Sequence, residues 1–195
     1  MRNALAFELG YSMGLDYTPK YEFVEVYVNG VYNGSYIITT PVDVGTDRVD
    51  IDENNDFLLE TEAPRNTNEK NGYYVTTPIF KIRALIDSPD TLSSEAYSKL
   101  YTTLYQIDFA ILSGDWNEIC KYIDVESMAK YFVYNEYLKN IDIIWDSTRF
   151  YIKDGKLYGG PAWDYDLSMG NVKKTEKLEG DDNSYTAYWN YTGLG

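Results

Sequence analysis

The sequence contains no histidine and only one cysteine, Cys120, in 195 residues. The lack of histidine excludes imidazole acid–base catalysis and imidazole metal ligands. A single cysteine excludes an internal disulfide framework and thiolate zinc clusters, and we expect Cys120 to be a small buried side chain. Any metal site must therefore use oxygen ligands, which favours Mg²⁺ or Mn²⁺, with Ca²⁺ as a further option.

Basic residues are also scarce, with 17 Lys and Arg against 31 Asp and Glu and a net charge of −14. This balance argues against nucleic acid or an anionic membrane as a partner, because both are bound by clustered Lys and Arg. A small phosphate ligand held through a divalent cation stays open. No apolar run of about 18 residues occurs, so we expect no membrane span. Acidic charge also serves solubility and by itself selects no function.

The length suits one domain with a real core, and the hydrophobic share of 44% is ordinary for a globular protein. The 21 tyrosines in an acidic chain fit an extracellular bacterial protein. No signal peptide is visible, because Met1-Arg2-Asn3 leads directly into an amphipathic segment. The sequence also stops abruptly at "YTGLG", and we expect it to be a piece of a larger protein.

The first half of the sequence predicts one helix followed by strands. Residues 2–13, "RNALAFELGYSM", have apolar positions at helical spacing, and Gly14 follows as a stop signal. Residues 21–39 change to a strand-like pattern around Asn29-Gly30, which predicts a hairpin. We expect further strands near 48–51, at 57–61 and at 73–82, with a polar loop at 63–72.

The second half predicts two long helices and a second hairpin. Ser93 and Ser94 precede the first helix, which runs to Leu112 and is closed by Gly114. Asp124 is the expected cap of the second helix, residues 125–140. Its apolar stripe at 125, 128, 129, 132 and 133 continues into Glu136 and Asn140, so polar groups are expected on the buried face where the helix ends. Strands flanking Asp154-Gly155 form the hairpin, and residues 172–195 show no clear period.

Two carboxylates lie in an unusual setting directly after this hairpin. The segment "GGPAWDYDLSMGN" (159–171) places Asp164 and Asp166 among glycine, proline and aromatic residues. Asp142 precedes the hairpin, and a short two-stranded connection would bring Asp142 back beside Asp164. Aspartates that hold a metal, with a separate aspartate that accepts a proton, are the working parts of phosphoryl transfer.

Each of these residues also has an ordinary structural explanation. A pair of aspartates in a loop commonly forms an Asx turn, a helix cap or a solvated surface pair. Glu136 can be a buried partner for an arginine such as Arg149. Lys81 and Lys139 can be surface lysines, and Trp163 can be a core residue. The spacing alone leaves these alternatives open.

The sequence resembles the CotH kinase family, the spore coat protein CotH and its relatives. The resemblance rests on residues 2–39, on "DRVDI" (47–51), on "FLLE" (57–60) and on residues 135–171. The last stretch holds the family's "N-E-x-x-x-N-x-D" and "P-x-W-D-[FY]-D" segments in the expected order. The resemblance implies a partial CotH kinase-like domain over 1–171, with 172–195 continuing it or forming a C-terminal extension.

What the resemblance implies is an α+β, divergent protein-kinase-like fold that transfers phosphate from ATP to Ser or Thr of secreted or spore-coat proteins, with Mg²⁺ or Mn²⁺. Asp142 would be the catalytic-loop aspartate and Asn140 would orient that loop. Asp164 would bind the metal, and Asp166 would be an additional or supporting ligand. Three further residues are assigned to nucleotide binding, namely Tyr158, Lys81 and Glu60.

The sequence also departs from the kinase pattern. Protein kinases carry an asparagine five residues after the catalytic aspartate to hold a second metal, and Ser147 stands at that position here. Thr40 replaces a carboxylate that relatives often carry, and no kinase-type glycine-rich phosphate loop is present. Relatives have β-rich sequence ahead of "RNALAF" that would supply a phosphate-binding lysine. We expect this fragment to lack part of that region, and the fragment alone can therefore be inactive. The alternative is therefore a non-catalytic extracellular scaffold, adhesion or carbohydrate-associated module that keeps the fold.

Overall fold

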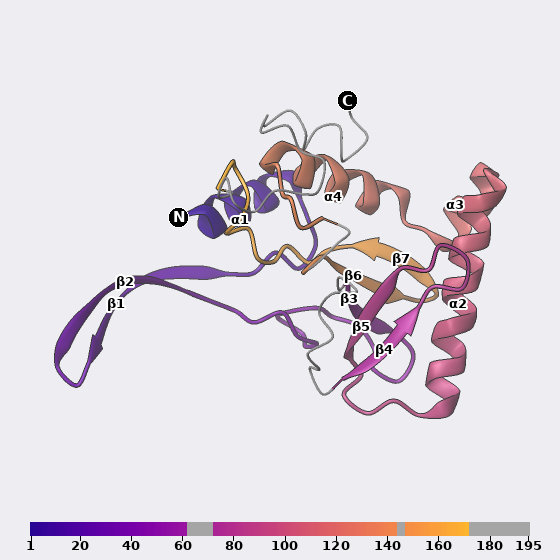
Figure 1. The fold of residues 1–195 in the computed structure, drawn as a ribbon, viewed down its shortest axis with the longest axis horizontal. Coiled ribbons are helices and arrows are strands. Elements are labelled where there is room, and N and C mark those ends of the chain that lie inside the picture. Colours follow the sequence, from indigo (N-terminus) through magenta and orange to yellow (C-terminus); the bar gives the residue numbers. More distant parts are fainter. Residues whose placement is uncertain (62–71, 144–146, 172–195) are drawn as a thin grey trace.

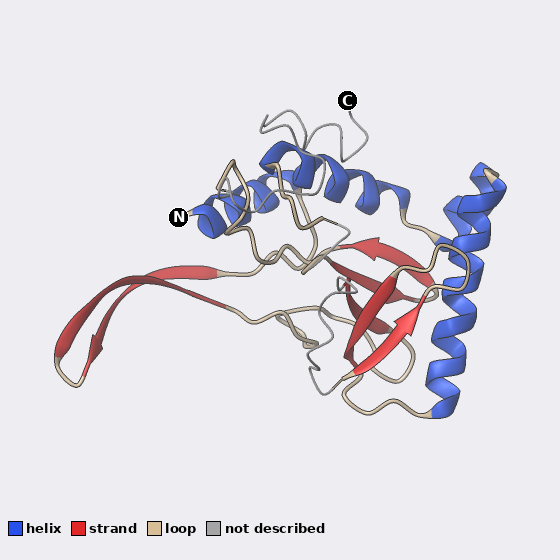
Figure 2. Cartoon of the chain, viewed as in Figure 1, coloured by secondary structure: helices blue, strands red, loops and turns tan. Residues whose placement is uncertain are grey.

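The computed structural model describes residues 1–61, 72–143 and 147–171 (Figure 1). Within these residues the chain forms four helices and two antiparallel sheets, one of two strands and one of five. The α+β class predicted from the sequence is confirmed, and Figure 2 shows the helices lying around the larger sheet. None of the described helices is both long enough and apolar enough to cross a membrane.

The N-terminal helix and hairpin form as predicted. Helix α1 (Arg2–Met13) ends at Gly14, which has a left-handed backbone. Strands β1 (Tyr21–Val28) and β2 (Val31–Thr39) pair through the turn at Asn29-Gly30, where both residues have positive φ. A tight turn of this kind matches the twist of the paired strands. Figure 1 shows this two-stranded ribbon extending away from the rest of the described chain.

The larger sheet has the strand order β4-β5-β3-β6-β7. Its central strand, β3 (Phe57–Thr61), is buried along its whole length. Strand β6 (Arg149–Lys153) pairs with β3 and turns at Asp154-Gly155 into β7 (Lys156–Gly159), which is the predicted second hairpin. The two faces of β3 enter different apolar clusters, because Phe57 and Leu59 face one way and Leu58 the other.

Two strand predictions are wrong. Residues 48–51 form no strand, and only an isolated bridge joins Val49 to Val44. The side chain of Val49 is buried, but its backbone hydrogen bonds are all made within the surrounding local turn. The strand expected over 73–82 is two strands, β4 (Tyr73–Thr76) and β5 (Arg83–Ser88), joined by a turn at 77–82. Asp108 holds that turn by accepting backbone hydrogen bonds from Ile79 and Phe80.

The long helices begin at the predicted caps. Helix α2 (Ser94–Ser113) starts at Ser93, whose hydroxyl accepts a hydrogen bond from the Ala96 amide, and it ends at Gly114. Helix α4 (Val125–Leu138) starts at Asp124 in the same way but ends before Asn140, with Lys139 in a left-handed conformation. The short helix α3 (Trp116–Tyr122) was not predicted, and it places Cys120 in a half-buried rather than a buried position.

The predicted apolar stripe of α4 lies on the wrong face. Phe132 and Val133 are exposed. The side chains that enter the core lie on a different face of the helix, again at helical spacing. The predicted burial of Glu136 and Asn140 where the helix ends is confirmed. The buried residues of α4 are Tyr131, Tyr134, Asn135, Glu136 and Leu138. They pack with α1 and with the segment after β7, so α4 joins the helical part of the core to the carboxylate segment. The expected polar loop at 63–72 falls almost entirely outside the described residues, as does the segment from 172 onward.

Candidate active site

Two loops converge at the start of β6. The Thr148 hydroxyl donates a hydrogen bond of 3.1 Å to the carbonyl oxygen of Asp142, which follows α4. The neighbouring Ser147 is hydrogen-bonded to the side chain of Asp164, which follows β7. Since Ser147 and Thr148 are adjacent, the loops that carry Asp142 and Asp164 meet at the same end of the β6–β7 hairpin. The sequence predicted this meeting from the length of the hairpin.

Asn140 holds the loop that carries Asp142. Its side-chain oxygen accepts a hydrogen bond of 3.2 Å from the Asp142 amide, and its side-chain nitrogen donates one of 2.9 Å to the Asn135 side chain on α4. Asn140 is only 5% exposed, so water does not compete for these bonds. This geometry lets Asn140 fix the backbone at Asp142, and its role in orienting a catalytic loop stays a prediction.

Asp164 and Asp166 form a carboxylate pair. Burial, together with the hydrogen bond to Asp166 and the negative charge of Asp166, raises the pKa of Asp164 to about 6. A hydrogen bond from Ser147 opposes that rise. Asp164 also has a positive φ of 58°, a backbone conformation that aspartate tolerates better than most residues. A pair of carboxylates that retains a proton in this way can exchange that proton for a divalent cation.

Arg149, the first residue of β6, lies under the carboxylate segment. Its guanidinium pairs with Glu60 on β3 at 3.2 Å and with Asp87 on β5. The guanidinium carbon lies 5.9 Å from the centre of the Trp163 ring. Burial lowers the pKa of Arg149, while the negative charges of Glu60 and Asp164 oppose that change. Arg149 therefore pairs with the sheet carboxylates and not with Glu136, which was the partner considered from the sequence.

Glu60, Lys81 and Tyr158 were assigned to nucleotide binding, and only Glu60 is near the carboxylate pair. Its carboxylate bonds to Arg149, and its negative charge acts on Asp164. Lys81 is exposed in the β4–β5 turn, where its side chain donates to the Pro78 carbonyl at 2.6 Å. Tyr158 stacks on the Tyr151 ring and lines a different cavity, of about 200 Å³, with Asp16 and Asp124.

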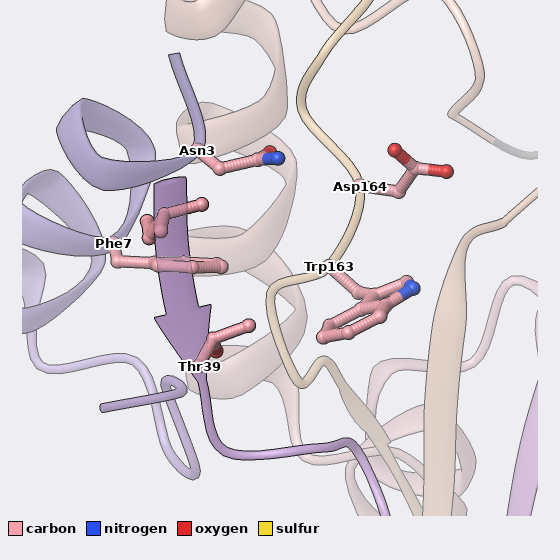
Figure 3. Close-up of a pocket in the computed structure, with 6 residues that line it drawn as sticks. Asn3, Phe7, Thr39, Trp163 and Asp164 are labelled. Atoms are coloured by element: carbon pink, nitrogen blue, oxygen red, sulfur yellow. The ribbon is translucent and has the colours of Figure 1, made fainter. Parts of the chain in front are cut away.

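A second cavity, of about 160 Å³, lies beside Asp164. It is lined by Asn3 and Phe7 of α1, Ile37 and Thr39 of β2, and by Trp163 and Asp164. Figure 3 shows the carboxyl group of Asp164 pointing away from Asn3 and Phe7, while the Trp163 indole stands beside the loop. Trp163 is half-buried and lines this cavity, so the expectation that it is a core residue is wrong.

The donor set around Asp164 fits part of a divalent cation site. Across 1–61, 72–143 and 147–171, no three acidic side chains are grouped so that they could hold a metal ion. The pair of Asp164 and Asp166, with the Ser147 hydroxyl beside it, supplies hard oxygen donors of the kind Mg²⁺ and Mn²⁺ use. Such ions commonly complete their coordination with water and substrate phosphates.

Comparison with known proteins places this arrangement in a family. The family model described as CotH kinase protein matches residues 1–194. The chain belongs to the CotH kinase protein family. The family match thus covers α1, the projecting hairpin and both loops that meet at Ser147 and Thr148. Searches of curated proteins and of solved structures found no significant match.

The sequence reasoning missed two residues that organise the site. Arg149 was considered only as a partner for Glu136, because its contact with Glu60 spans 89 residues of sequence. Asn135 belongs to the family's "N-E-x-x-x-N-x-D" segment, but the sequence predicted no role for it. The signal that marks Asn135 is its place at helical spacing among Tyr131, Tyr134 and Leu138, where an amide must find partners inside the core.

Proposed function

We propose that this member of the CotH kinase protein family is a metal-dependent protein kinase that transfers phosphate from ATP to Ser or Thr. The observation that carries the proposal is the meeting of two aspartate-bearing loops at Ser147 and Thr148. One loop offers an aspartate whose backbone is fixed by a buried asparagine, and the other offers a carboxylate pair. Positioning and charge stabilisation supply most of the catalysis in phosphoryl transfer.

The charge at the site makes a cation necessary for this reaction. Three carboxylates share one guanidinium, that of Arg149, because Glu60 and Asp87 pair with it and Asp164 lies within its electrostatic reach. The triphosphate of ATP would be repelled by such a site unless Mg²⁺ or Mn²⁺ bound first. Asp164 and Asp166 would hold that ion, which would neutralise phosphate charge, and Asp142 would accept the proton of the attacking hydroxyl.

The protein-kinase-like fold, the substrates and the location are parts of the same proposal. A divergent kinase-like arrangement accounts for a helix-supported catalytic loop that precedes a hairpin and a metal-binding segment. The acidic, tyrosine-rich composition supports a secreted or surface location, where the substrates would be Ser- or Thr-rich secreted or spore-coat proteins.

A non-catalytic scaffold is the second candidate, and the position of Lys81 favours it. The lysine assigned to the nucleotide bonds to its own turn, and Arg149, whose charge interacts with Asp164, is already paired with two carboxylates. A protein that kept the fold for assembly on a cell exterior would need no phosphate-binding lysine.

The two candidates differ in nucleotide binding. We expect the full-length natural protein that contains this chain to bind ATP together with Mn²⁺ or Mg²⁺, as measured by calorimetry. It should also transfer radiolabelled phosphate to a Ser-rich protein or to itself. The Asp142→Ala variant controls for contaminating kinases. Absence of both nucleotide binding and transfer in that protein would leave the scaffold as the function.

A further inference from the structure

The two loops of the candidate site are joined through one atom. The side-chain oxygen of Asn135 accepts a hydrogen bond of 2.9 Å from the Asn140 side chain and one of 3.1 Å from the Tyr165 hydroxyl. Asn140 holds the Asp142 amide, and Tyr165 lies between Asp164 and Asp166 in sequence. Each aspartate-bearing loop is therefore positioned by a hydrogen bond to the same oxygen atom on α4.

We propose that Asn135 is a positioning residue that sets the catalytic aspartate loop against the carboxylate pair. The proposal rests on the proposed phosphoryl-transfer function and adds to it a residue that touches neither nucleotide nor metal. Its action passes through Asn140 to Asp142 on one side and through Tyr165 to Asp164 and Asp166 on the other.

Asn135 itself is held firmly. Its side-chain nitrogen donates a hydrogen bond of 2.8 Å to the Tyr131 carbonyl, one turn earlier in α4, so its oxygen must face the two loops. It is only 1% exposed, and Tyr165 is 0% exposed. Neither donor can turn to water instead, so the geometry of both loops depends on this oxygen.

The tyrosine side of the junction is also fixed. Asn3 on α1 accepts a hydrogen bond of 2.6 Å from the Tyr165 amide, and the Tyr165 ring packs edge-on against Tyr134 at 5.2 Å. Because the Tyr165 ring is buried, its hydroxyl is held in place to donate to the Asn135 side-chain oxygen. The Tyr165 hydroxyl thus completes a rigid path from α4 into the segment between the two carboxylates.

An ordinary core asparagine would satisfy the same hydrogen bonds without any effect on the site. The two explanations differ in what happens when only one link is cut. Tyr165→Phe removes the hydroxyl that joins the carboxylate loop to Asn135. Tyr151→Phe is the matched control, because Tyr151 is similarly buried and its hydroxyl donates a hydrogen bond of 3.3 Å to the Asp16 carboxylate, which belongs to neither loop.

The first measurement is the dissociation constant of Mn²⁺ with ATP, by calorimetry, for the wild type and both variants. Positioning partners of metal ligands typically change affinity by about 10- to 100-fold. We expect Tyr165→Phe to weaken Mn²⁺–ATP binding at least about tenfold and Tyr151→Phe to weaken it less than about twofold. Equal effects in the two variants, whether large or absent, would overturn the proposal.

The second measurement does not depend on ligand binding. Amide hydrogen exchange in the unliganded protein should become faster in Tyr165→Phe at residues 163–168 and also at 140–142, which share the Asn135 oxygen with Tyr165. Tyr151→Phe should leave both loops at the wild-type rate. If the wild type binds no Mn²⁺–ATP, the proposed kinase function fails, and this exchange pattern alone decides the coupling. Unchanged exchange at 140–142 in Tyr165→Phe would refute it.

Discussion

The carboxyl groups of Asp164 and Asp166 are hydrogen-bonded to each other in the segment that follows β7. Burial, this hydrogen bond and the negative charge of Asp166 raise the pKa of Asp164 from 3.8 to about 6. The pair therefore prefers to keep a proton at mildly acidic pH and to give it up when a cation arrives.

The stability of the metal-free protein should depend on this proton. The folded state holds it more tightly than the unfolded state, so the stabilisation is complete below pH 4 and is lost as the pH rises through about 6. Because Asp164 is half-buried, we expect a contribution of about 1 kcal/mol, well below the full ~3 kcal/mol of such a shift. Urea unfolding of wild type and Asp164→Asn at pH 4.5 and 7.5, with EDTA, measures it. Identical pH dependence of the unfolding free energy in the two proteins would contradict the raised pKa of Asp164.

Removal of the Asp164 carboxylate should abolish metal-dependent nucleotide binding. We expect Asp164→Ala to weaken Mn²⁺–ATP binding by at least about 100-fold, because the ion loses a direct ligand. The melting temperature without metal should fall only modestly, because alanine tolerates the left-handed backbone less well than aspartate, while the variant also removes a repulsive contact with Asp166. Asp90→Ala, at an exposed carboxylate before α2, is the control. An unfolded Asp164→Ala protein, with Mn²⁺–ATP affinity intact in its folded fraction, would make Asp164 a structural residue.

Asp142 should act on the chemical step and not on binding. A positioned base typically contributes about 10²- to 10⁴-fold to the rate. We expect Asp142→Ala to lose phosphate transfer by that amount and to keep the wild-type dissociation constant for Mn²⁺–ATP. Single-turnover transfer and calorimetry measure the two quantities separately. A parallel loss of binding would assign Asp142 to the metal instead.

The buried carboxylate of Glu136 should lower the free energy of unfolding of the protein. Its side chain is 6% exposed, and its Oε1 has no hydrogen-bond partner among the described residues. Because an unpartnered buried polar group costs about 1–3 kcal/mol, we expect Glu136→Met to raise the free energy of unfolding by about 1 kcal/mol or more. Urea titration tests this, with Glu126→Met at the exposed start of α4 as the control. A destabilised Glu136→Met protein would show that the carboxylate has a structural role.

The local signals in the sequence were sufficient for the parts of the fold that neighbouring residues determine. Asn29-Gly30 and Asp154-Gly155 adopt the positive φ angles that tight hairpin turns require. Ser93 and Asp124 cap their helices through their own side chains. The meeting of the loops that carry Asp142 and Asp164 was also predictable, because a short hairpin returns the chain to its starting point.

The remaining errors come from contacts that the local sequence does not encode. The turn that divides β4 from β5 is held by Asp108, 29 residues after Ile79. The buried face of α4 is set by packing against α1 and the carboxylate segment, so the apolar spacing alone predicted the wrong stripe. The ion pair between Arg149 and Glu60 requires β3 and β6 to be adjacent in the sheet. The sequence of neither strand indicates that the two strands pair.

The most direct test of the central claim is a crystal structure of the protein with Mn²⁺ and a non-hydrolysable ATP analogue, with anomalous data collected to locate manganese. The account predicts an anomalous peak within about 2.5 Å of carboxylate oxygens of Asp164 or Asp166, in contact with the phosphates and close to Asp142. A nucleotide bound elsewhere, or manganese coordinated without either carboxylate, would contradict it.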